Sequence, residues 1–406
     1  MVFHKRYFII KKAVSLAIIS FMNVPIVIIG GGASALMLAS LLPEKSALII
    51  DANPKPGEKI RISGGGKCNL SNMRMDASFY RGESRFVSAV LRRFDQNDLI
   101  SWLQKRGLRP VVRKKRQYFC PHSASELLSL FYKESAKQHF LPNERVLEVT
   151  EREGLFTVKS DRRRVYASAV VVASGGLSFP KLGASGIGYE IAEKFGHTVI
   201  KTAPALVGFT VQKEQFFFKE LSGISTDVVI CVGKQRCEGA LLFAHKGISG
   251  PAVLDASLYW EKGMITIDFL PDFDWKTLRG SKKRISSLLP LPKRVTKAFL
   301  LQFNIRDKAG REVSSEETAL LKRLNEYAFA PAGTFGYAKA EVTKGGVSTE
   351  EIVVDTMESK RKKGLYFIGE VVDVTGRLGG YNFQWAFSSA FVCAENLKKV
   401  GRRNES

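Results

Sequence analysis

The sequence lacks the cysteine pattern of a disulfide framework or of a zinc site. It has five cysteines, an odd number, and no two of them form a Cys-x-x-Cys pair. We therefore expect a protein of the reducing cytoplasm, without a metal centre. The sequence also has no run of about 18 apolar residues, so we expect no integral membrane span.

Acidic residues are scarce beside basic ones. There are 62 Lys and Arg against 39 Asp and Glu, a net charge of +23. Such a charge attracts nucleic acid, anionic membrane surfaces or acidic ligands, or it reflects a general basic bias. No basic stretch carries the interleaved aromatic residues of a base-stacking surface. We therefore expect a small-molecule substrate, with nucleic acid as the alternative partner.

Residues 1–23 form a segment distinct from the rest of the chain. The basic start and the apolar stretch after it resemble a signal peptide, but there is no small-residue cleavage site. A second methionine, Met22, directly precedes the first predicted strand. Two interpretations remain open: a start codon assigned too early, and a targeting or membrane-touching extension.

A strand–helix–strand pattern opens the rest of the chain. Ile26–Ile29 is a continuous apolar run, a glycine-rich turn and a helical stretch come next, and a second strand ends at Asp51. The pattern predicts an α/β fold with a doubly wound Rossmann-like domain. The 406 residues allow two to four domains, and the composition changes near 200 and again near 345. We predict a nucleotide-binding domain from 24–200 and 345–406, a β-rich inserted domain from 201–275 and 333–344, and a helical subdomain at 276–332.

The turn after the first strand carries a dinucleotide fingerprint. Gly30 permits the tight turn, Gly32 lets the backbone approach a pyrophosphate, and Ala35 is small where helix and strand pack. The helix beginning near Ser34 offers free N–H groups to the phosphates. Asp51 lies where a carboxylate binds ribose hydroxyls, and it would repel a 2′-phosphate. These residues favour FAD or NAD over NADP.

Seven ordered motifs extend this interpretation over the chain, at 28–34, 62–72, 173–181, 242–251, 340–347, 369–376 and 379–386. Together they resemble the BaiN/RdsA-like flavoproteins, described as NAD(P)/FAD-dependent oxidoreductases, from about residue 24 to 398. The resemblance implies FAD as the cofactor, which carries the hydride chemistry itself. It places the 63–69 loop near the cofactor, residues 369–373 at the ribityl chain and the helix opening at 379–382 at the isoalloxazine ring. The predicted cofactor-binding residues are Gly30, Gly32, Ser34, Ala35, Asp51, Lys59, Ser63, Gly64, Gly65, Gly66, Asn69, Val146, Ala173, Gly175, Gly176, Gly369, Glu370, Asp373, Gly379, Gly380, Tyr381, Asn382 and Gln384.

Three residues are predicted to act on the substrate. His245, in a glycine-rich loop of the inserted region, can donate or accept a proton near neutral pH, although a structural histidine fits its position equally well. Tyr381 and Asn382 could face the flavin. Cys68 is interpreted as a small buried residue, because no resolving cysteine lies near it in the sequence.

No second nucleotide fingerprint comes after the first. The glycines at 183, 186 and 188 stand behind Phe-Pro-Lys instead of a strand, so we predict that NAD(P)H binds only transiently. The sequence thus predicts an FAD-dependent oxidoreductase that reduces an enone-type double bond, or one that oxidises an amine or ketone with oxygen. The alternatives are an RNA-directed flavoprotein that uses the basic surface, and a flavin-containing regulator or membrane-surface electron carrier.

Overall fold

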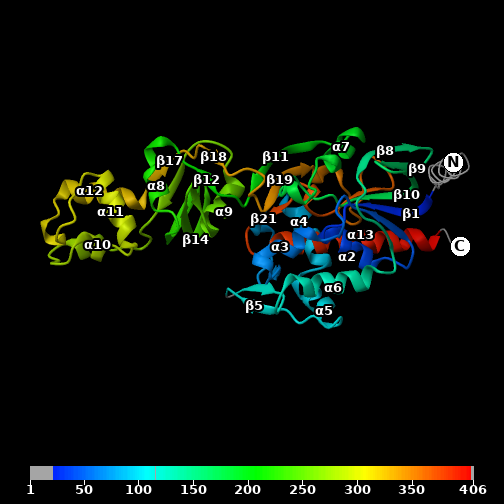
Figure 1. Ribbon diagram of the computed structural model, residues 1–406, viewed down its shortest axis with the longest axis horizontal. Coiled ribbons are helices and arrows are strands. Elements are labelled where there is room, and N and C mark those ends of the chain that lie inside the picture. The colour runs from blue at the N-terminus through cyan, green and yellow to red at the C-terminus, as the bar shows by residue number, and fades with distance from the viewer. Residues whose placement is uncertain (1–21, 115, 404–406) are drawn as a thin grey trace, which may run out of the picture. The chain divides into compact units, whose positions relative to one another are not determined.

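The computed structural model describes residues 22–114 and 116–403, so most of the segment 1–23 lies outside the described residues. The chain forms two compact units (Figure 1). The first ends at Thr202 and resumes at Gly345, and the second is Ala203–Lys344. The chain leaves the first unit along β11 (Val199–Ala205) and returns along β19 (Val342–Val347).

A seven-stranded mixed sheet forms the centre of the first unit. Five strands are parallel, in the order β7, β2, β1, β10 and β20. The antiparallel strands β9 and β8 extend the sheet beyond the first half of β10. The bounds are β7 (His139–Leu141), β2 (Ala47–Ile50), β1 (Met22–Ile29), β10 (Arg164–Val172), β20 (Leu365–Phe367), β9 (Leu155–Ser160) and β8 (Val146–Arg152).

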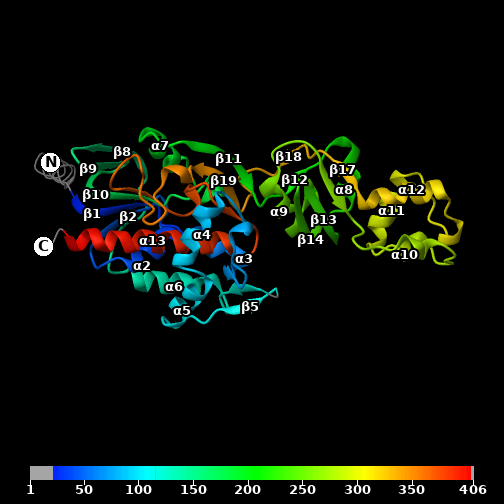
Figure 2. The same ribbon diagram turned by 180° about the vertical axis from the view of Figure 1, so that it is seen from behind.

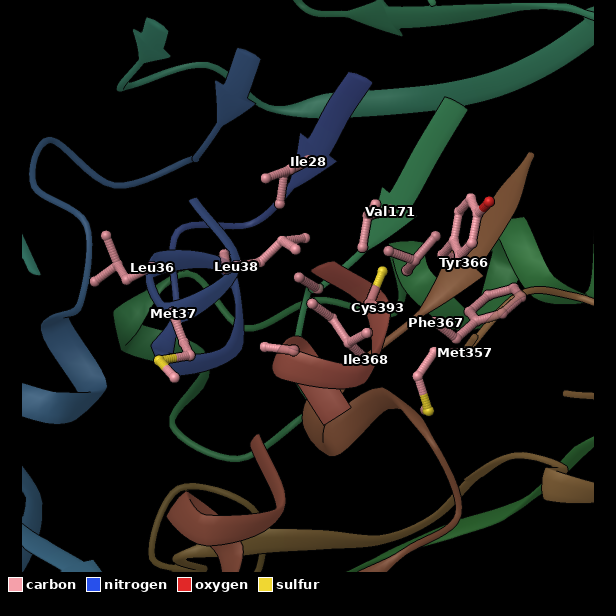
Figure 3. Packing of buried hydrophobic residues seen from close by; sticks show 14 of the residues in the cluster. Ile28, Leu36, Met37, Leu38, Val171, Met357, Tyr366, Phe367, Ile368 and Cys393 are labelled. Carbon is pink, nitrogen blue, oxygen red and sulfur yellow. The ribbon is translucent and has the colours of Figure 1, made fainter. Parts of the chain in front are cut away.

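Helices α2 (Ala33–Leu41) and α13 (Tyr381–Arg403) pack against each other beside this sheet, as both views show (Figures 1 and 2). Strand β2 is buried at every position, as expected of a strand covered on both faces. Figure 3 shows Ile28, Val171, Leu38, Ile368 and Cys393 in one apolar layer. The prediction of a doubly wound α/β domain is confirmed.

Smaller elements surround this centre. The helices are α3 (Glu58–Gly66), α4 (Ser84–Arg93), α5 (Gln96–Gln104), α6 (Ala124–Ser135) and α7 (Ile187–Lys194). Strands β3 (Asn69–Asn72), β6 (Gln117–Phe119) and β5 (Val111–Arg113) form a separate antiparallel sheet, and β4 (Tyr80–Arg81) pairs with β21 (Thr375–Gly376). The stretch 84–106, which reads as one helical segment, is two helices, because Asp95 caps α5 through a capping box with Asp98.

The second unit has a seven-stranded antiparallel sheet of its own. Its order is β17 (Tyr327–Phe329), β16 (Ile265–Asp268), β13 (Ser225–Val232), β14 (Gln235–Ala244), β15 (Gly247–Ser249), β12 (Phe209–Thr210) and β18 (Gly333–Thr334). Helix α9 (Pro251–Tyr259) packs on β13 and β14, and α8 (Phe217–Glu220) contacts β14.

Three helices lie between β16 and β17 along the chain: α10 (Ile285–Leu288), α11 (Lys293–Gln302) and α12 (Ser315–Lys322). In the figures they gather at one end of the second unit (Figure 1). The strand β17 falls within the range predicted as a helical subdomain, because three residues are too few to show a period of their own. Within 22–114 and 116–403, no helix combines the length and the apolar character needed to cross a membrane.

Candidate cofactor site

The carboxyl ends of four parallel strands bring the first group of predicted residues together. Strands β2, β1, β10 and β20 end in register, and the residues directly after them are Asp51, Gly30, Ala173 and, one position later, Gly369. The Ala173 N–H donates to the carbonyl of Ile29 at 2.9 Å. Ligands of open α/β sheets bind at this edge. The fold therefore brings these four positions together at the edge where such ligands bind.

The two fingerprint glycines differ in what surrounds them. Gly30 has φ +99°, and a Cβ there would lie 2.6 Å from the carbonyl oxygen of Ala173, so glycine is required by the protein itself. Gly32 has φ −78°, and a Cβ there would meet no atom within 4 Å. Gly32 is also the N-cap of α2 and provides no side-chain cap. Open space beside uncapped N–H groups fits an anionic pyrophosphate.

The end of β20 is held against α2 and α13. Gly369 has φ +74°, and a Cβ there would lie 2.6 Å from the Ser34 hydroxyl. Its N–H donates to Ser389 Oγ at 3.0 Å, and its carbonyl accepts from Trp385 Nε1 at 3.0 Å. Because both backbone groups are engaged, the position of this turn is fixed by α13.

Asp51 is a buried carboxylate at the end of β2. It is 8% exposed, and its Oδ1 accepts the Asn53 N–H at 2.6 Å. Burial raises the pKa of Asp51 above its ordinary value, despite this hydrogen bond. Its carbonyl accepts the Glu144 N–H at 2.9 Å, which brings the chain leading to Val146 beside it. A carboxylate at this position can accept hydrogen bonds from ribose hydroxyls.

A glycine-rich turn interrupts α3 within the predicted 63–69 loop. Residues 58–62 are helical, and the helix breaks at Ser63, which has ψ 147°. Gly64, Gly65 and Gly66 then all have positive φ, and a Cβ on Gly65 or Gly66 would meet nothing within 4 Å. This turn has the same open character as Gly32 and Gly175, where a Cβ also meets no atom. Such glycines leave backbone N–H groups accessible to a ligand.

Two predicted cofactor carboxylates are paired with cations. Lys59 Nζ lies 2.7 Å from Glu370 Oε2, and Arg81 Nη1 lies 3.4 Å from Asp373 Oδ1. Burial raises the pKa of Asp373 above its ordinary value, although Arg81 opposes this. The Lys59–Glu370 pair joins α3 to the turn after β20, which lie far apart in the sequence.

The start of α13 lies against β3. A Cβ on Gly380 would lie 2.5 Å from the Ser71 carbonyl oxygen and 2.8 Å from Asn69 Oδ1, so a side chain has no room there. Asn72 Nδ2 donates to the Gly379 carbonyl at 3.0 Å. The predicted residues Asn69, Gly379 and Gly380 are therefore brought together by one tight backbone approach.

Three neighbours on α13 have clear packing contacts. The Tyr381 ring stacks on Phe79 with ring centroids 4.9 Å apart, and its carbonyl accepts the Tyr80 hydroxyl at 2.9 Å. Asn382 accepts the Gly376 N–H at 2.8 Å and donates to the Gly376 carbonyl at 2.9 Å.

Gln384, the third of these neighbours, is fully buried. Its side chain accepts from Ser71 Oγ at 2.7 Å and donates to the Phe94 carbonyl at 3.1 Å. A structural role accounts for all three residues, so the catalytic roles of Tyr381 and Asn382 stay predictions.

His245 belongs to the second unit. It is exposed at the two-residue turn between β14 and β15, beside Lys246. His245, the third residue predicted to be catalytic, therefore lies at the tip of a hairpin, and its side chain is exposed to solvent. An exposed imidazole can exchange protons with water and with a substrate.

Sequence reasoning missed a cysteine neighbour of Cys68. Cys120 lies directly after β6, its N–H donates to the Cys68 carbonyl at 3.3 Å, and both residues are fully buried. The hydrogen bond between the two thiols, together with burial, raises the pKa of Cys68 well above its ordinary value. No sequence pattern could have linked them, because the antiparallel pairing of β3 and β6 brings them together. Cys68 is buried, as interpreted from the sequence.

The glycines at 183, 186 and 188 have structural explanations. Gly183 has φ +84°, and Gly186 is the N-cap of α7, which is not preceded by a strand. A Cβ on Gly188 would lie 2.2 Å from Ser174 Oγ, so close packing requires this glycine. These contacts account for the cluster without a second nucleotide.

A surface cavity of about 850 Å³ lies elsewhere in the first unit. It is bounded by α4 and by the segment 349–360, with Arg85, Arg92 and Lys360 among the lining residues. None of the predicted cofactor residues lines it. We therefore do not assign it to the cofactor.

The fold and the glycine cradle at the sheet edge define a dinucleotide-binding Rossmann domain of the flavoprotein type. The chain belongs to the family described as "HI0933-like protein Rossmann domain", whose model matches residues 24–396. The predicted resemblance to the BaiN/RdsA-like flavoproteins is thereby confirmed. The protein is an FAD-binding oxidoreductase of this family.

Two curated relatives span nearly the whole chain. The chain is 38% identical over 388 residues to the "Ribosomal RNA dihydrouridine synthase" of Escherichia coli, covering 91% of this chain and 97% of the relative. It is 30% identical over 399 residues to the "3-dehydro-bile acid delta(4,6)-reductase" of Clostridium scindens, covering 90% and 97%.

Among solved structures, a variant of the FrdA chain of E. coli quinol fumarate reductase is similar in fold. The TM-score is 0.52 at 14% identity, and the match covers 95% of this chain and 71% of that one. This likeness concerns the fold alone.

Proposed function

We propose that the protein reduces the C5=C6 double bond of uridine in ribosomal RNA, with FAD as the bound cofactor and NAD(P)H as a transient donor. The observation that carries the proposal is the 38% identity, over 91% of this chain, to a relative named as a ribosomal RNA dihydrouridine synthase. The net charge of +23 fits a polyanionic substrate.

The chemistry of the two named relatives supports one type of acceptor. In uracil, C5=C6 is conjugated to the C4 carbonyl, so a hydride can add at C6 and a proton at C5. The name of the Clostridium relative describes double bonds at positions 4 and 6 of a 3-dehydro compound, which are conjugated to a ketone in the same way. We infer that this chain also reduces a double bond conjugated to a carbonyl.

The residues of the first unit would hold FAD through its phosphates and its ribose. Gly30, Gly32 and the uncapped start of α2 would accommodate the pyrophosphate, and Asp51 would accept hydrogen bonds from ribose hydroxyls. The 64–66 turn supplies accessible backbone N–H groups. When bound, FAD supplies the hydride-transfer chemistry, whereas the protein orients it and excludes water. The start of α13 contributes the positive end of a helix dipole.

A proton must reach the substrate when the double bond is reduced. We propose His245 as its source, since it is exposed on a tight hairpin and an imidazole exchanges protons near neutral pH. Replacing His245 with Gln would then lower the reduction rate by about 10²-fold or more, the usual contribution of one general acid. We expect FAD binding to stay unchanged, because none of the residues proposed to hold FAD lies on the hairpin of His245.

The proposal is tested with an in vitro transcript of bacterial ribosomal RNA, which carries no modified nucleosides. The FAD-loaded protein is incubated with this RNA and with NADPH or NADH, and the nucleosides are analysed by mass spectrometry. We expect a uridine heavier by two hydrogen atoms at a defined position, absent when the donor is omitted. Unchanged RNA with both donors, from protein that retains FAD, would contradict the proposal.

A second candidate is reduction of a small enone, favoured by the 30% identity to the bile-acid reductase. A 3-keto-4,6-diene steroid in the same assay distinguishes the two candidates. Turnover of the steroid together with unchanged RNA would favour the small-molecule function.

A further inference from the structure

The positive charge of the second unit is concentrated in its helical part. Residues 276–332 contain thirteen Lys and Arg against five Asp and Glu, a net charge of +8. The rest of this unit, 203–275 and 333–344, contains eight against ten, a net charge of −2. A general basic bias would not divide one compact unit in this way.

Nearly all of these basic side chains face solvent. The exception is the half-buried Lys308, whose Nζ lies 2.7 Å from Glu317 Oε2. None of the other twelve has a carboxylate within salt-bridge distance among the described residues. Their charge is therefore not neutralised within the described part of the protein. The twelve exposed residues are Lys276, Arg279, Lys282, Lys283, Arg284, Lys293, Arg294, Lys297, Arg306, Arg311, Lys322 and Arg323.

Helix α11 shows how the fold presents this charge. Val295, Phe299 and Leu300 are buried in the core of the second unit. Lys293, Arg294 and Lys297 are exposed, and at about 100° per residue they lie within one sector of about 100°, opposite Val295 and Phe299. The helix thus holds three cations on one side while its apolar side fixes it to the core.

We propose that the segment 276–332, the basic helical surface, binds the phosphate backbone of folded RNA. The inference rests on the proposed function and names the part of the chain that holds the RNA substrate. Salt-sensitive contacts between Lys or Arg and phosphates supply most of the affinity of proteins for nucleic acids. No large aromatic side chain is exposed in this segment, so it suits a structured RNA backbone more than unstacked bases.

Two other kinds of partner fit this surface less well. A membrane-binding helix carries a row of exposed apolar residues beside its cations, whereas Leu301 is the single large apolar side chain of this segment that is exposed among the described residues. Protein–protein interfaces are depleted of lysine, and six of the twelve exposed cations are lysines, at 276, 282, 283, 293, 297 and 322.

The test uses the full-length, FAD-loaded protein and two variants with four substitutions each. The test variant removes four exposed lysines of the basic helical surface, K282Q, K283Q, K293Q and K297Q. The control variant removes four equally exposed lysines from the rest of the same unit, K213Q, K234Q, K262Q and K339Q. Both variants lose the same charge, and FAD retention and circular dichroism verify that both fold.

The affinity for in vitro transcribed ribosomal RNA is measured between about 50 and 200 mM salt. We expect the test variant to bind at least about tenfold more weakly, with the slope of log K against log salt reduced by about 3, and the control variant to bind like the unmodified protein. Equal binding by both variants, when the unmodified protein reduces uridine in this RNA, would overturn this inference and leave the proposed function standing.

Two further outcomes are informative. Absence of RNA binding and of uridine reduction by the unmodified protein would instead refute the proposed function itself. Vesicles containing phosphatidylserine serve as the membrane probe. If the test substitutions abolish binding to vesicles and leave RNA binding unchanged, the surface binds membranes and the inference is wrong.

Discussion

The two fingerprint glycines allow the cofactor requirement to be separated from the folding requirement. At Gly32 the backbone is extended, and a Cβ would meet no protein atom within 4 Å. Gly32→Ala costs up to about 1 kcal/mol of stability at an N-cap. It also reduces the conformational entropy of the unfolded chain, which stabilises the folded protein by about 0.4–1 kcal/mol. The apoprotein should therefore keep its melting temperature within about 4 °C.

FAD binding should respond differently to the same change. The added methyl group occupies the space through which the pyrophosphate approaches the backbone. Loss of one hydrogen bond to a charged group weakens binding by about 1.5–3 kcal/mol, which is about 10- to 150-fold in Kd. Gly30→Ala is the matched control, because its Cβ would lie 2.6 Å from the Ala173 carbonyl oxygen at a φ of +99°. It should destabilise the apoprotein by more than about 1–2 kcal/mol.

The assay is fluorescence titration of the apoproteins with FAD, together with thermal unfolding followed by circular dichroism. The reasoning would be refuted if Gly32→Ala bound FAD with the affinity of the unmodified protein. It would also be refuted if Gly32→Ala unfolded at the temperature of Gly30→Ala, since the space beside Gly32 would then be needed by the protein itself.

Three other groups of the protein give predictions of their own. Asp51→Asn keeps an acceptor for the Asn53 N–H but loses the negative charge. The Kd for FAD, measured by the same titration, should therefore rise about tenfold or more. An unchanged Kd would exclude a contact between Asp51 and the ribose. Burial lowers the pKa of His197 below its ordinary 6.5, against the opposing effect of Glu351, so the unfolded chain binds a proton at His197 more readily than the folded protein does. The unfolding free energy, measured by denaturant titration, should therefore fall as the pH drops below about 6.5, and His197→Gln should reduce this fall. An identical pH profile for the variant would contradict the reasoning. Cys231 is the one cysteine of the five that is not buried. A thiol reagent should therefore modify one thiol rapidly in the native protein and all five after denaturation. Rapid modification of two or more thiols in the native protein would show that the core opens.

The sequence predicts the parallel sheet and its first turn well, because their signals are local. Each of β1, β2 and β20 contains an apolar run, and the turn at Gly30 and Gly32 comes directly after one of them. Helix boundaries are harder to predict: the break before α5 depends on one capping box at Asp95, within a stretch of uniform helical composition.

Contacts between distant segments account for what the sequence cannot predict. Gln384 is buried because Ser71 and the Phe94 carbonyl supply its hydrogen bonds, and nothing near Gln384 in the sequence indicates these partners. The same holds for Lys59 with Glu370 and for Cys68 with Cys120. The motif resemblance predicted the cofactor positions as a group, and the structure adds the pairwise contacts among them.

The most direct test of the proposed function is a single turnover without oxygen. The FAD-loaded protein is reduced anaerobically and then mixed with in vitro transcribed ribosomal RNA, while the absorbance of oxidised flavin is monitored. We predict that this absorbance returns and that one uridine gains two hydrogen atoms for each flavin oxidised. Flavin that stays reduced with RNA but is oxidised by a 3-keto-4,6-diene steroid, or by oxygen alone, would contradict the proposed function.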